Sequence, residues 1–371
     1  MIGEVIVHLG DTKTGSTSIQ RALVQKAYEV PGSSILYPTG NHHIAMAKTL
    51  TQARRFKDRE RRFRRVGEAL RSSDADYGIV SAEHFQSVDP EVFAEAISAY
   101  WPGLQDRMRL VAYVRPHPDK LLSAFAERVK LGNALGSFEN FTKTLSKNKA
   151  IDYLPRFSKW RQVFGDRFEL RPFVRKELFR EDAVADFFRF VLGHDDFRIA
   201  GGLSANTSLT VPQLALLREV HKVFSARLDE LELKKNPEIT EARNAMGRTT
   251  SERVRESGLG QDGEKALIPA HLAEQIQERY AEDAAALDAE FFDGTPMSDA
   301  LAAIGSKTTG TAQPLKAARY FSDETVAGVR IFAGVMSEML LNDPEQFRKL
   351  ASGSRLMFMD GRGEARKEQT T

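Results

Sequence analysis

The sequence predicts an α/β fold, a doubly wound and mainly parallel sheet flanked by helices, with a helical C-terminal extension. Short apolar runs alternate with segments of helical spacing over about the first 200 residues. The chain opens as strand, glycine-bounded loop and helix, and strand signals fade beyond Gly201. Alternating strands and helices imply right-handed βαβ units and a sheet covered on both faces.

The first strand is expected at Glu4–Leu9, where the β-branched run EVIVHL is typical of a strand buried in a parallel sheet. A helix follows over Ser16–Tyr28. The remaining expected strands are Ser34–Tyr37, Tyr77–Ser81, Arg109–Val114 and Phe168–Phe173. The other expected helices are Pro90–Trp101, Pro118–Leu131, Pro212–Leu233, Pro269–Phe292 and Glu324–Leu341.

The length of 371 residues allows one large α/β domain with additions or two domains. We expect an α/β core over residues 1–200 and a helical part over 201–304 that packs on it. Residues 305–371 would follow as a small polar linker, a helical extension and a frayed tail.

Charge and composition exclude several classes of protein. The 53 Lys and Arg residues nearly balance 51 Asp and Glu, which argues against a dedicated nucleic-acid binder. The absence of cysteine excludes disulfides, thiolate zinc sites and cysteine nucleophiles. The start of the chain lacks the pattern of a signal peptide, and no apolar run is long enough to span a bilayer, so we expect a cytoplasmic protein.

The basic run Arg54–Arg65 carries Phe56 and Phe63 one heptad apart. A solvated helix with one apolar edge is the ordinary interpretation of such a run. The alternative is a surface for an anionic acceptor or a peripheral contact with a membrane.

The loop GDTKTGSTS, from Gly10 to Ser18, is the most informative segment. A buried strand that ends in a glycine-bounded loop and opens a helix directs several backbone N–H groups at one point, where the helix dipole also favours an anion. Lys13 adds a mobile positive charge, and Ser16, Thr17 and Ser18 add hydroxyls. The alternative interpretation is an ordinary βα turn with Ser16 as the N-cap.

This loop departs from the nucleoside-triphosphatase pattern GxxxxGK[ST]. Gly10 and Gly15 have the right spacing, but Ser16 occupies the lysine position and the lysine has moved to Lys13. The expected strand Tyr77–Ser81 continues into Ala-Glu and not into a clear Mg²⁺-binding Asp. A magnesium-dependent kinase is therefore disfavoured, and no metal is expected.

A second candidate anion site follows the strand Arg109–Val114. Arg115 stands at the carboxyl end of this strand, where open α/β sheets bind ligands. Ser123 falls early in the next helix, able to face back toward Arg115. A guanidinium and a hydroxyl suit a terminal phosphate, although each residue taken alone is equally compatible with a surface ion pair or a mid-helix serine.

Both motifs resemble those of sulfotransferases that use 3′-phosphoadenosine 5′-phosphosulfate, and the resemblance is nearest to bacterial and carbohydrate-type members. HLGDTKTGSTSIQ is similar to their 5′-phosphosulfate loop, and YVRPHPDKLLSAFAE to their 3′-phosphate motif of arginine followed by serine eight residues later. The resemblance covers about the first 200 residues. It implies a P-loop-like fold with 3′-phosphoadenosine 5′-phosphosulfate as the donor. This chain departs from the commoner Pro-Lys-Thr loop in having Thr12 before Lys13.

The same resemblance implies roles for residues of both motifs. Arg115 and Ser123 would hold the 3′-phosphate, and the acceptor would be a carbohydrate or another small molecule. The residues that would hold the 5′ end are Lys13, Thr14, Gly15, Ser16, Thr17 and Ser18.

A general base would remove the proton of the acceptor hydroxyl or amine. Glu83 and His84 are the leading candidates, because they follow the expected strand Tyr77–Ser81 at the same sheet edge as both anion sites. Glu83 could instead cap a turn, with His84 packed nearby. His42 and His43 form the other candidate pair, placed at the acceptor cleft or on the surface.

Two other functions stay open. The same loop could serve a nucleotide or small-molecule kinase, or a nucleotide-binding module without catalysis could act through its helical part. Asn206–Leu209, just before the first helix of the C-terminal part, is interpreted as a capping turn in preference to a segment that closes over the nucleotide.

Overall fold

The computed structural model describes residues 2–201, 208–233 and 236–359, with side chains described as far as Ala351. The chain divides into two compact units. The sheet unit comprises Met1–Lys120, Ile151–Ala205 and Ile276–Ile304, and the helical unit comprises Leu121–Ala150, Asn206–Gln275 and Gly305–Thr371. Helix α5 begins in the sheet unit and ends in the helical unit.

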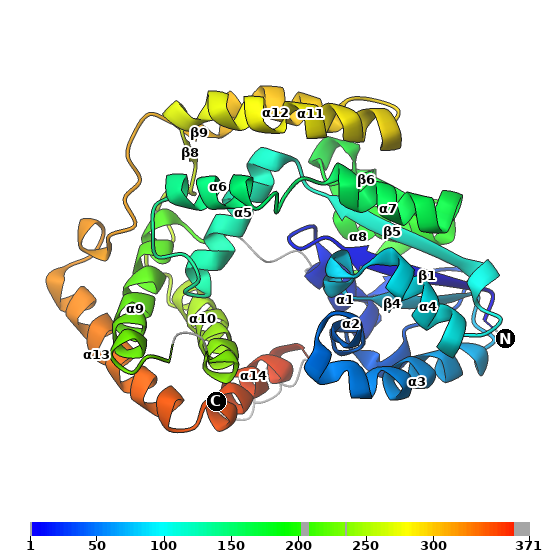
Figure 1. Cartoon of the computed structure of the whole chain (residues 1–371), viewed down its shortest axis with the longest axis horizontal. Coiled ribbons are helices and arrows are strands. Elements are labelled where there is room, and N and C mark those ends of the chain that lie inside the picture. The colour runs from blue at the N-terminus through cyan, green and yellow to red at the C-terminus, as the bar shows by residue number, and fades with distance from the viewer. Residues whose placement is uncertain (1, 202–207, 234–235, 360–371) are drawn as a thin grey trace. The chain divides into compact units, whose positions relative to one another are not determined.

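The sheet unit contains a parallel sheet whose five strands, counted over the described residues, run in the order β3-β4-β1-β5-β6 (Figure 1). The predicted α/β class is confirmed. The strands are β1 (Glu4–Gly10), β3 (Ile35–Leu36), β4 (Tyr77–Ser81), β5 (Met108–Val114) and β6 (Phe168–Pro172). All five were predicted, each within two residues at either end. Short strands β2 (Tyr28–Glu29) and β7 (Arg198–Ile199) form a separate antiparallel pair.

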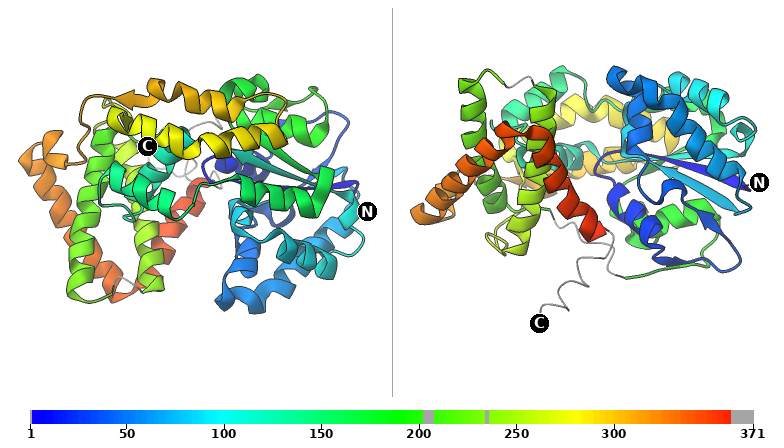
Figure 2. Two further views of the ribbon diagram at one scale, coloured as in Figure 1. Left: turned by 45° about the horizontal axis from the view of Figure 1, so that its top comes forward. Right: turned by 90° about the horizontal axis from the view of Figure 1, so that it is seen from below.

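Alternation along the strands gives the sheet two apolar faces. On one face, Ile6, Ile79 and Val111 pack against α1 (Ser16–Gln25) and α8 (Ala183–Leu192). The opposite face carries α4 (Pro90–Tyr100) and α7 (Leu154–Phe164), whose Phe93 and Trp160 rings lie 5.6 Å apart. Figure 2 shows helices above and below the strands of this unit. A sheet buried on both faces explains why its strand sequences are continuous apolar runs.

The remaining helices complete the two units. Those of the sheet unit are α2 (Ile44–Thr51), α3 (Arg59–Arg71) and α12 (Pro296–Ala302), together with most of α11 (Ala273–Phe291). Those of the helical unit are α6 (Phe138–Lys147), α9 (Val211–Glu230), α10 (Pro237–Glu256), α13 (Asp323–Asn342) and α14 (Pro344–Met359). Helix α5 spans His117–Lys130, and the parallel pair β8 (Ile268–Pro269) and β9 (Thr308–Thr309) lies in the helical unit.

From the sequence we expect three consecutive parts with boundaries at residues 200 and 304. The structure instead has two units, each assembled from three separate segments of the chain. Residues 276–304, expected in the helical part, belong to the sheet unit because Asp283 bonds His117 at 2.9 Å and Phe291 packs edge-on against Phe168. Residues 121–150, expected in the core, belong to the helical unit, where His221 of α9 bonds the Lys130 carbonyl at 2.7 Å. Interactions across many residues of sequence, which a scan along the chain does not reveal, decide the grouping.

The basic run Arg54–Arg65 forms the short 3₁₀ segment Ala53–Asp58 and the start of α3. Its arginines bond near neighbours, as in the pairs Arg61–Asp58 at 2.7 Å and Arg64–Glu60 at 2.8 Å. Phe63 is fully buried, whereas Phe56 is 47% exposed. The run is therefore a solvated helical face with Phe63 as its apolar anchor. Within the part of the chain that the structure describes, no helix is both long and apolar enough to cross a membrane.

Asp186 of α8 is a buried residue that connects several elements of the sheet unit through hydrogen bonds; we call it a junction. Its carboxylate accepts hydrogen bonds from the Tyr113 hydroxyl at 2.8 Å, from Arg171 at 2.7 and 2.9 Å, and from the Phe179 amide at 2.9 Å. These contacts join α8 to β5 and β6. A buried carboxylate with several donors is expensive to alter, because the neutral donors then lose an acceptor and Arg171 loses a buried counter-charge.

We expect Asp186→Asn to lower the free energy of unfolding by about 3 kcal/mol, because the Arg171 guanidinium loses its buried partner. Urea denaturation followed by tryptophan fluorescence measures this change. The matched control is Asp195→Asn, which breaks the exposed pair with Arg189 and should cost less than about 1 kcal/mol. Equal losses in the two variants would contradict the assignment of Asp186 as a junction.

Candidate functional site

The loop between β1 and α1 has a special backbone. Gly10 and Gly15 have φ angles of 97° and 79°, and Lys13 has a φ of 69°. A Cβ on Gly10 would lie 2.9 Å from Glu83 Cα, and one on Gly15 would lie 2.8 Å from Ala183 Cβ. Both glycines are therefore required by conformation and by space. A non-glycine residue in the left-handed region is uncommon, and such residues cluster at binding sites.

Thr14 and Ser16, which we expected to bind the ligand, use their hydroxyls within the loop itself. The Thr14 side chain is fully buried, and its hydroxyl donates to the Asp11 carbonyl at 2.7 Å. The Ser16 hydroxyl donates to the same carbonyl at 3.1 Å. These two side chains therefore shape the loop, and what they can offer an anion is their backbone N–H groups. Lys13 is exposed, and Thr17 and Ser18 are half-buried in the first turn of α1.

Helix α1 begins with Gly15, and not Ser16, as its N-cap. Among the described residues no side chain caps this end, and its first turn carries no acidic residue. The first N–H groups of a helix need partners from outside it. An uncapped end that follows a glycine-bounded loop is suited to an anion, which supplies both the acceptors and the negative charge.

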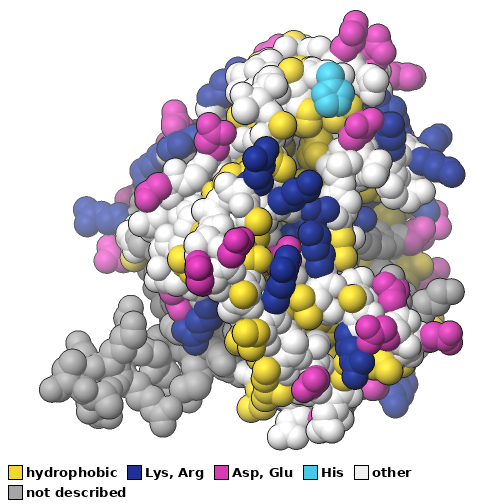
Figure 3. Space-filling view, turned by 90° about the vertical axis from the view of Figure 1, so that its left-hand side faces the viewer, with side chains coloured by type: hydrophobic (Ala, Val, Ile, Leu, Met, Phe, Trp, Pro, Cys, Tyr) yellow, Lys and Arg dark blue, Asp and Glu magenta, His cyan; other side chains and the backbone are white. Residues whose placement is uncertain are grey.

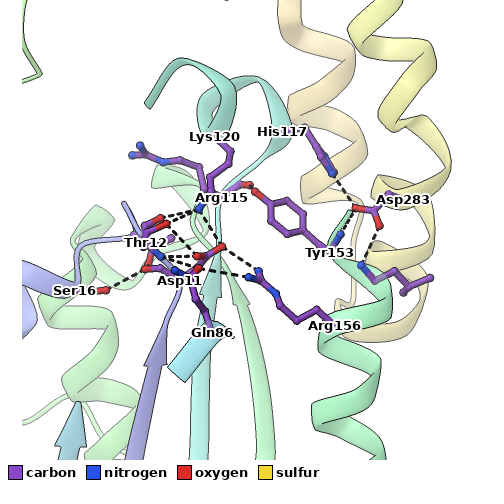
Figure 4. Close-up of polar contacts among 12 residues, drawn as sticks. Asp11, Thr12, Ser16, Gln86, Arg115, His117, Lys120, Tyr153, Arg156 and Asp283 are labelled. Carbon is purple, nitrogen blue, oxygen red and sulfur yellow. Dashed lines mark hydrogen bonds and ion pairs between the residues drawn. The ribbon is translucent and has the colours of Figure 1, made fainter. Parts of the chain in front are cut away.

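A buried cluster of charged side chains holds the loop between β1 and α1 in place (Figure 4). The Asp11 carboxylate, 1% exposed, lies 3.1 Å from Lys120 Nζ and 3.0 Å from Arg156 Nη2. Lys120 Nζ also donates to the Thr12 carbonyl and hydroxyl at 3.0 and 2.9 Å. The cluster joins the loop to the first turn of α5 and to α7. Two cations around one carboxylate leave a net positive charge at the base of the loop.

Burial and neighbouring charges have opposite effects on the pKa of Asp11, and the charges have the larger effect. Burial alone would raise the pKa of this carboxyl, but Arg156 and Lys120 outweigh it and hold the pKa below its usual value. Burial lowers the pKa of Lys120, and the charge of Asp11 opposes that change. The carboxylate is therefore ionised at neutral pH.

Glu83 and His84 lie beside this loop. They open the 3₁₀ segment Glu83–Ser87 directly after β4, and both are half-buried. The backbone of Glu83 packs against Gly10. Gln86 of the same segment accepts hydrogen bonds from the Thr12 amide and from Arg156, each at 3.4 Å. The predicted placement of Glu83 and His84 at the carboxyl edge of the sheet is confirmed, while their chemical role stays a prediction.

His43 lies in the interior, and not on the surface as one of our two expectations had it. Its Nδ1 accepts the Ser81 amide at 3.2 Å, and its own amide donates to the Ser81 carbonyl at 2.8 Å. Burial lowers its pKa to about 4. His8 on β1 is also buried, bonds the Ser81 hydroxyl at 2.8 Å, and has a pKa lowered by burial to about 3. Both histidines are neutral at pH 7. His8 joins β1 to β4, and His43 joins the start of α2 to β4, while His42 beside His43 is half-buried.

Arg115 follows β5 directly, as predicted, and two contacts support it. Its guanidinium lies 5.0 Å from the centre of the Phe173 ring, and its carbonyl accepts the Tyr153 hydroxyl at 3.0 Å. Tyr153 is held in turn by Asp283, which accepts the Tyr153 amide and His117 Nε2, both at 2.9 Å. Burial lowers the pKa of Arg115 from its usual value, which means that the charged form would gain from an anionic ligand.

The other half of the predicted 3′-phosphate motif lies in the other unit. Ser123 is in the second turn of α5, in the part of that helix that belongs to the helical unit. Its pairing with Arg115 stays a prediction. Asn206 and Thr207 lie outside the described residues, and the N-cap of α9 is Thr210, in a capping box with Gln213.

Sequence reasoning missed the cations of the ion cluster and the support of Arg115. Lys120 lies within the segment YVRPHPDKLLSAFAE, five residues after Arg115, so its place in the first helical turn was an available signal. Arg156 bonds a residue 145 positions away, and Asp283 acts on a segment 130 positions away. No local pattern marks either of them.

The stability that Asp11 contributes should depend on pH. A carboxyl whose folded pKa is depressed contributes stability above its unfolded pKa of about 4 and loses that contribution as pH falls through the folded pKa. We therefore expect Asp11→Asn to cost about 3 kcal/mol at pH 7, with the gap between wild type and variant narrowing below about pH 4. Denaturant unfolding between pH 3 and 7 measures the gap. A gap of constant size, or one as small as that of Asp195→Asn, would contradict the cluster.

Comparison with known proteins gives no family assignment for this chain. No known family matches it, and no curated protein matches it. Among solved structures it is similar to a sulfotransferase from Alicyclobacillus acidocaldarius, with a TM-score of 0.37 and 16% sequence identity. The match covers 61% of this chain and 94% of the other.

Proposed function

We propose that this chain is a sulfotransferase that moves a sulfuryl group from 3′-phosphoadenosine 5′-phosphosulfate to an acceptor hydroxyl or amine, with carbohydrate as the preferred acceptor. One observation carries the proposal. The Lys13 loop and Arg115 follow β1 and β5, which are neighbouring parallel strands, and the Asp11 amide donates to the Tyr113 carbonyl at 3.1 Å. Two candidate anion sites on one edge suit a ligand with two separated anionic groups.

The loop supports binding of the 5′ end of the donor. The uncapped start of α1 supplies N–H groups, and Lys13 supplies a charge on an exposed side chain. The Asp11 cluster fixes the loop before any ligand arrives, so little conformational entropy is lost on binding. In this proposal Lys13, Gly15 and the first turn of α1 hold the 5′-phosphosulfate.

Arg115 is proposed to hold the 3′-phosphate, with Ser123 as its partner. The guanidinium is stacked on Phe173 and its main chain is fixed by Tyr153. A guanidinium held in this way can bind two phosphate oxygens with less loss of side-chain freedom than a lysine.

The chemistry follows from this placement. The acceptor oxygen or nitrogen attacks sulfur in line, the bond from sulfur to the bridging oxygen breaks, and 3′-phosphoadenosine 5′-phosphate leaves. Lys13 stabilises the negative charge that develops on the bridging oxygen. Because transfer needs alignment and charge stabilisation more than covalent help, the loop and Lys13 are proposed to act without a metal.

Glu83 is the preferred base, with His84 second. Glu83 adjoins Gly10 at the loop, so its carboxylate can approach an acceptor directed at the same anion site. His43 is a poor choice, because its ring is buried and its Nδ1 already accepts the Ser81 amide, so neither ring nitrogen is placed to meet an acceptor hydroxyl.

Isothermal calorimetry on the full chain tests the donor. We expect 3′-phosphoadenosine 5′-phosphate to bind more tightly than ATP with Mg²⁺, and Arg115→Ala to weaken its binding by about 10- to 100-fold, because a charge-assisted contact is lost. The matched control is Arg175→Ala, whose side chain is 83% exposed and paired with Glu181.

Two results would contradict this donor assignment. Preference for ATP with Mg²⁺ would favour a kinase that uses the same loop. Unchanged affinity in Arg115→Ala would remove the proposed 3′-phosphate site. Tight binding of the bisphosphate without a sulfated product from any acceptor would instead favour a nucleotide-binding module without catalysis.

For the base, we expect Glu83→Gln to lower turnover by about 10²- to 10⁴-fold while the affinity for 3′-phosphoadenosine 5′-phosphate stays within a factor of two or so, because the amide cannot accept the proton. Transfer of ³⁵S from labelled donor to a carbohydrate panel measures turnover. Glu91→Gln, in the exposed first turn of α4, is the control. Wild-type turnover in Glu83→Gln together with loss in His84→Gln would assign the base to His84.

A further inference from the structure

The helical unit contains a large apolar cavity of its own. It has a volume of about 650 Å³ and lies among α9, α10, α13 and α14. All of its lining residues belong to the helical unit. The volume falls within the range of about 300–1,000 Å³ that is usual for small-molecule sites, and no step of the proposed sulfuryl transfer uses it.

The lining divides into an apolar wall and a polar rim. Side chains of α9, α13 and α14 supply the wall, and they include Leu216, Val220, Val329, Met336, Phe347 and Leu350. Thr249, Thr250 and Arg253 of α10 and its C-cap Ser257 supply the rim, while Met246 and Val254 of the same helix add to the apolar wall. The Thr249 and Ser257 hydroxyls already donate to the Ala351 and Val254 carbonyls at 3.2 and 2.9 Å. A buried ligand would therefore meet hydrocarbon and few open hydrogen-bonding groups.

Exposed apolar side chains continue the wall along α13. Phe332 and Met339, which line the cavity, are 49% and 55% exposed, and Ile331 and Val335 beside them are 70% and 53% exposed. Figure 3, a face of the molecule in space-filling form, shows hydrophobic side chains gathered among basic ones. Contiguous exposed apolar surface of this kind marks an interaction site in soluble proteins.

We propose that this cavity binds a long-chain aliphatic compound with an anionic head group, of the fatty-acid class. The chain would enter between α13 and α10, with its methylenes against the apolar wall and its head at the rim. Arg253, whose side chain is 59% exposed, donates from Nη1 to Glu256 at 2.7 Å. A guanidinium carries five N–H donors, so it can also donate to the carboxylate of a ligand at the rim. Met336 and Met339 suit a ligand of variable shape, because unbranched thioether side chains adjust to irregular contacts.

The hollow shape favours a chain over a second copy of the protein. A protein partner needs a broad complementary surface, whereas four helices here line a half-open hollow whose surface is nearly all hydrocarbon. Gly328 contributes directly to the hollow, since a Cβ built on it meets nothing within 4 Å. A Cβ on Gly334 of the same helix also meets nothing within 4 Å, but Gly334 does not line the cavity.

The test is calorimetric titration of the full-length protein with saturated fatty acids of 8 to about 16 carbons, below their micellar concentrations. We expect binding whose affinity rises by up to about fourfold per added methylene until the cavity is filled. An alcohol of equal chain length should bind more weakly than the acid, and Arg253→Ala should remove that difference.

Gly328→Leu and Gly334→Leu form a matched pair of variants. Both replace a helical glycine with a better helix former, so neither should lower the midpoint of thermal unfolding. Gly328→Leu projects a side chain into the cavity and should weaken fatty-acid binding by about tenfold or more. Gly334→Leu should leave binding unchanged. Circular dichroism verifies that both variants are folded.

Three outcomes would overturn the proposal. The first is the absence of binding at any chain length. The second is equal binding by folded Gly328→Leu and wild type. The third is a dimer in sedimentation experiments that Gly328→Leu weakens while no fatty acid binds, which would make this surface an interface between copies. None of these readouts depends on sulfuryl transfer, so they are independent of the proposed enzymatic activity.

Discussion

The buried pairing of Asp11 with Lys120 and Arg156 is the interaction on which the candidate site depends. A carboxylate placed inside the protein needs counter-charges, and here they come from two different helices. The cluster therefore fixes the loop and the starts of α5 and α7 relative to one another. Because α5 starts just after Arg115 and α7 just after Tyr153, the same charges define the surroundings of the second candidate anion site.

Much of this fold could be predicted because the sheet is buried on both faces. Runs such as EVIVHL and RLVAYV have no polar face, so their length and the glycines and prolines that follow mark them clearly as strands. Helix α10 was not predicted. Its buried positions include Ala242, Ala245 and Gly247, and such small side chains leave only a weak apolar stripe between charged residues.

The parts of the site that lie in a local sequence motif could be predicted. The parts that come from distant segments of the chain could not. The loop residues and Arg115 stand next to strands, so their arrival at one edge follows from parallel pairing. The roles of Thr14 and Ser16 could not be told from their types, because a hydroxyl that binds a ligand and one that braces a backbone carbonyl look alike in sequence. Arg156 and Asp283 act across 145 and 130 positions.

The contact of Gly10 with the backbone of Glu83 has a consequence for any dissection of this protein. The two residues share a wall with no room for a methyl group, so a shift of either segment displaces the other. Changes in the loop and changes in the 3₁₀ segment will then not act as independent perturbations, and their free energies will not add. The loop and the 3₁₀ segment are best regarded as one structural unit, in which a larger side chain on either side meets the same steric limit.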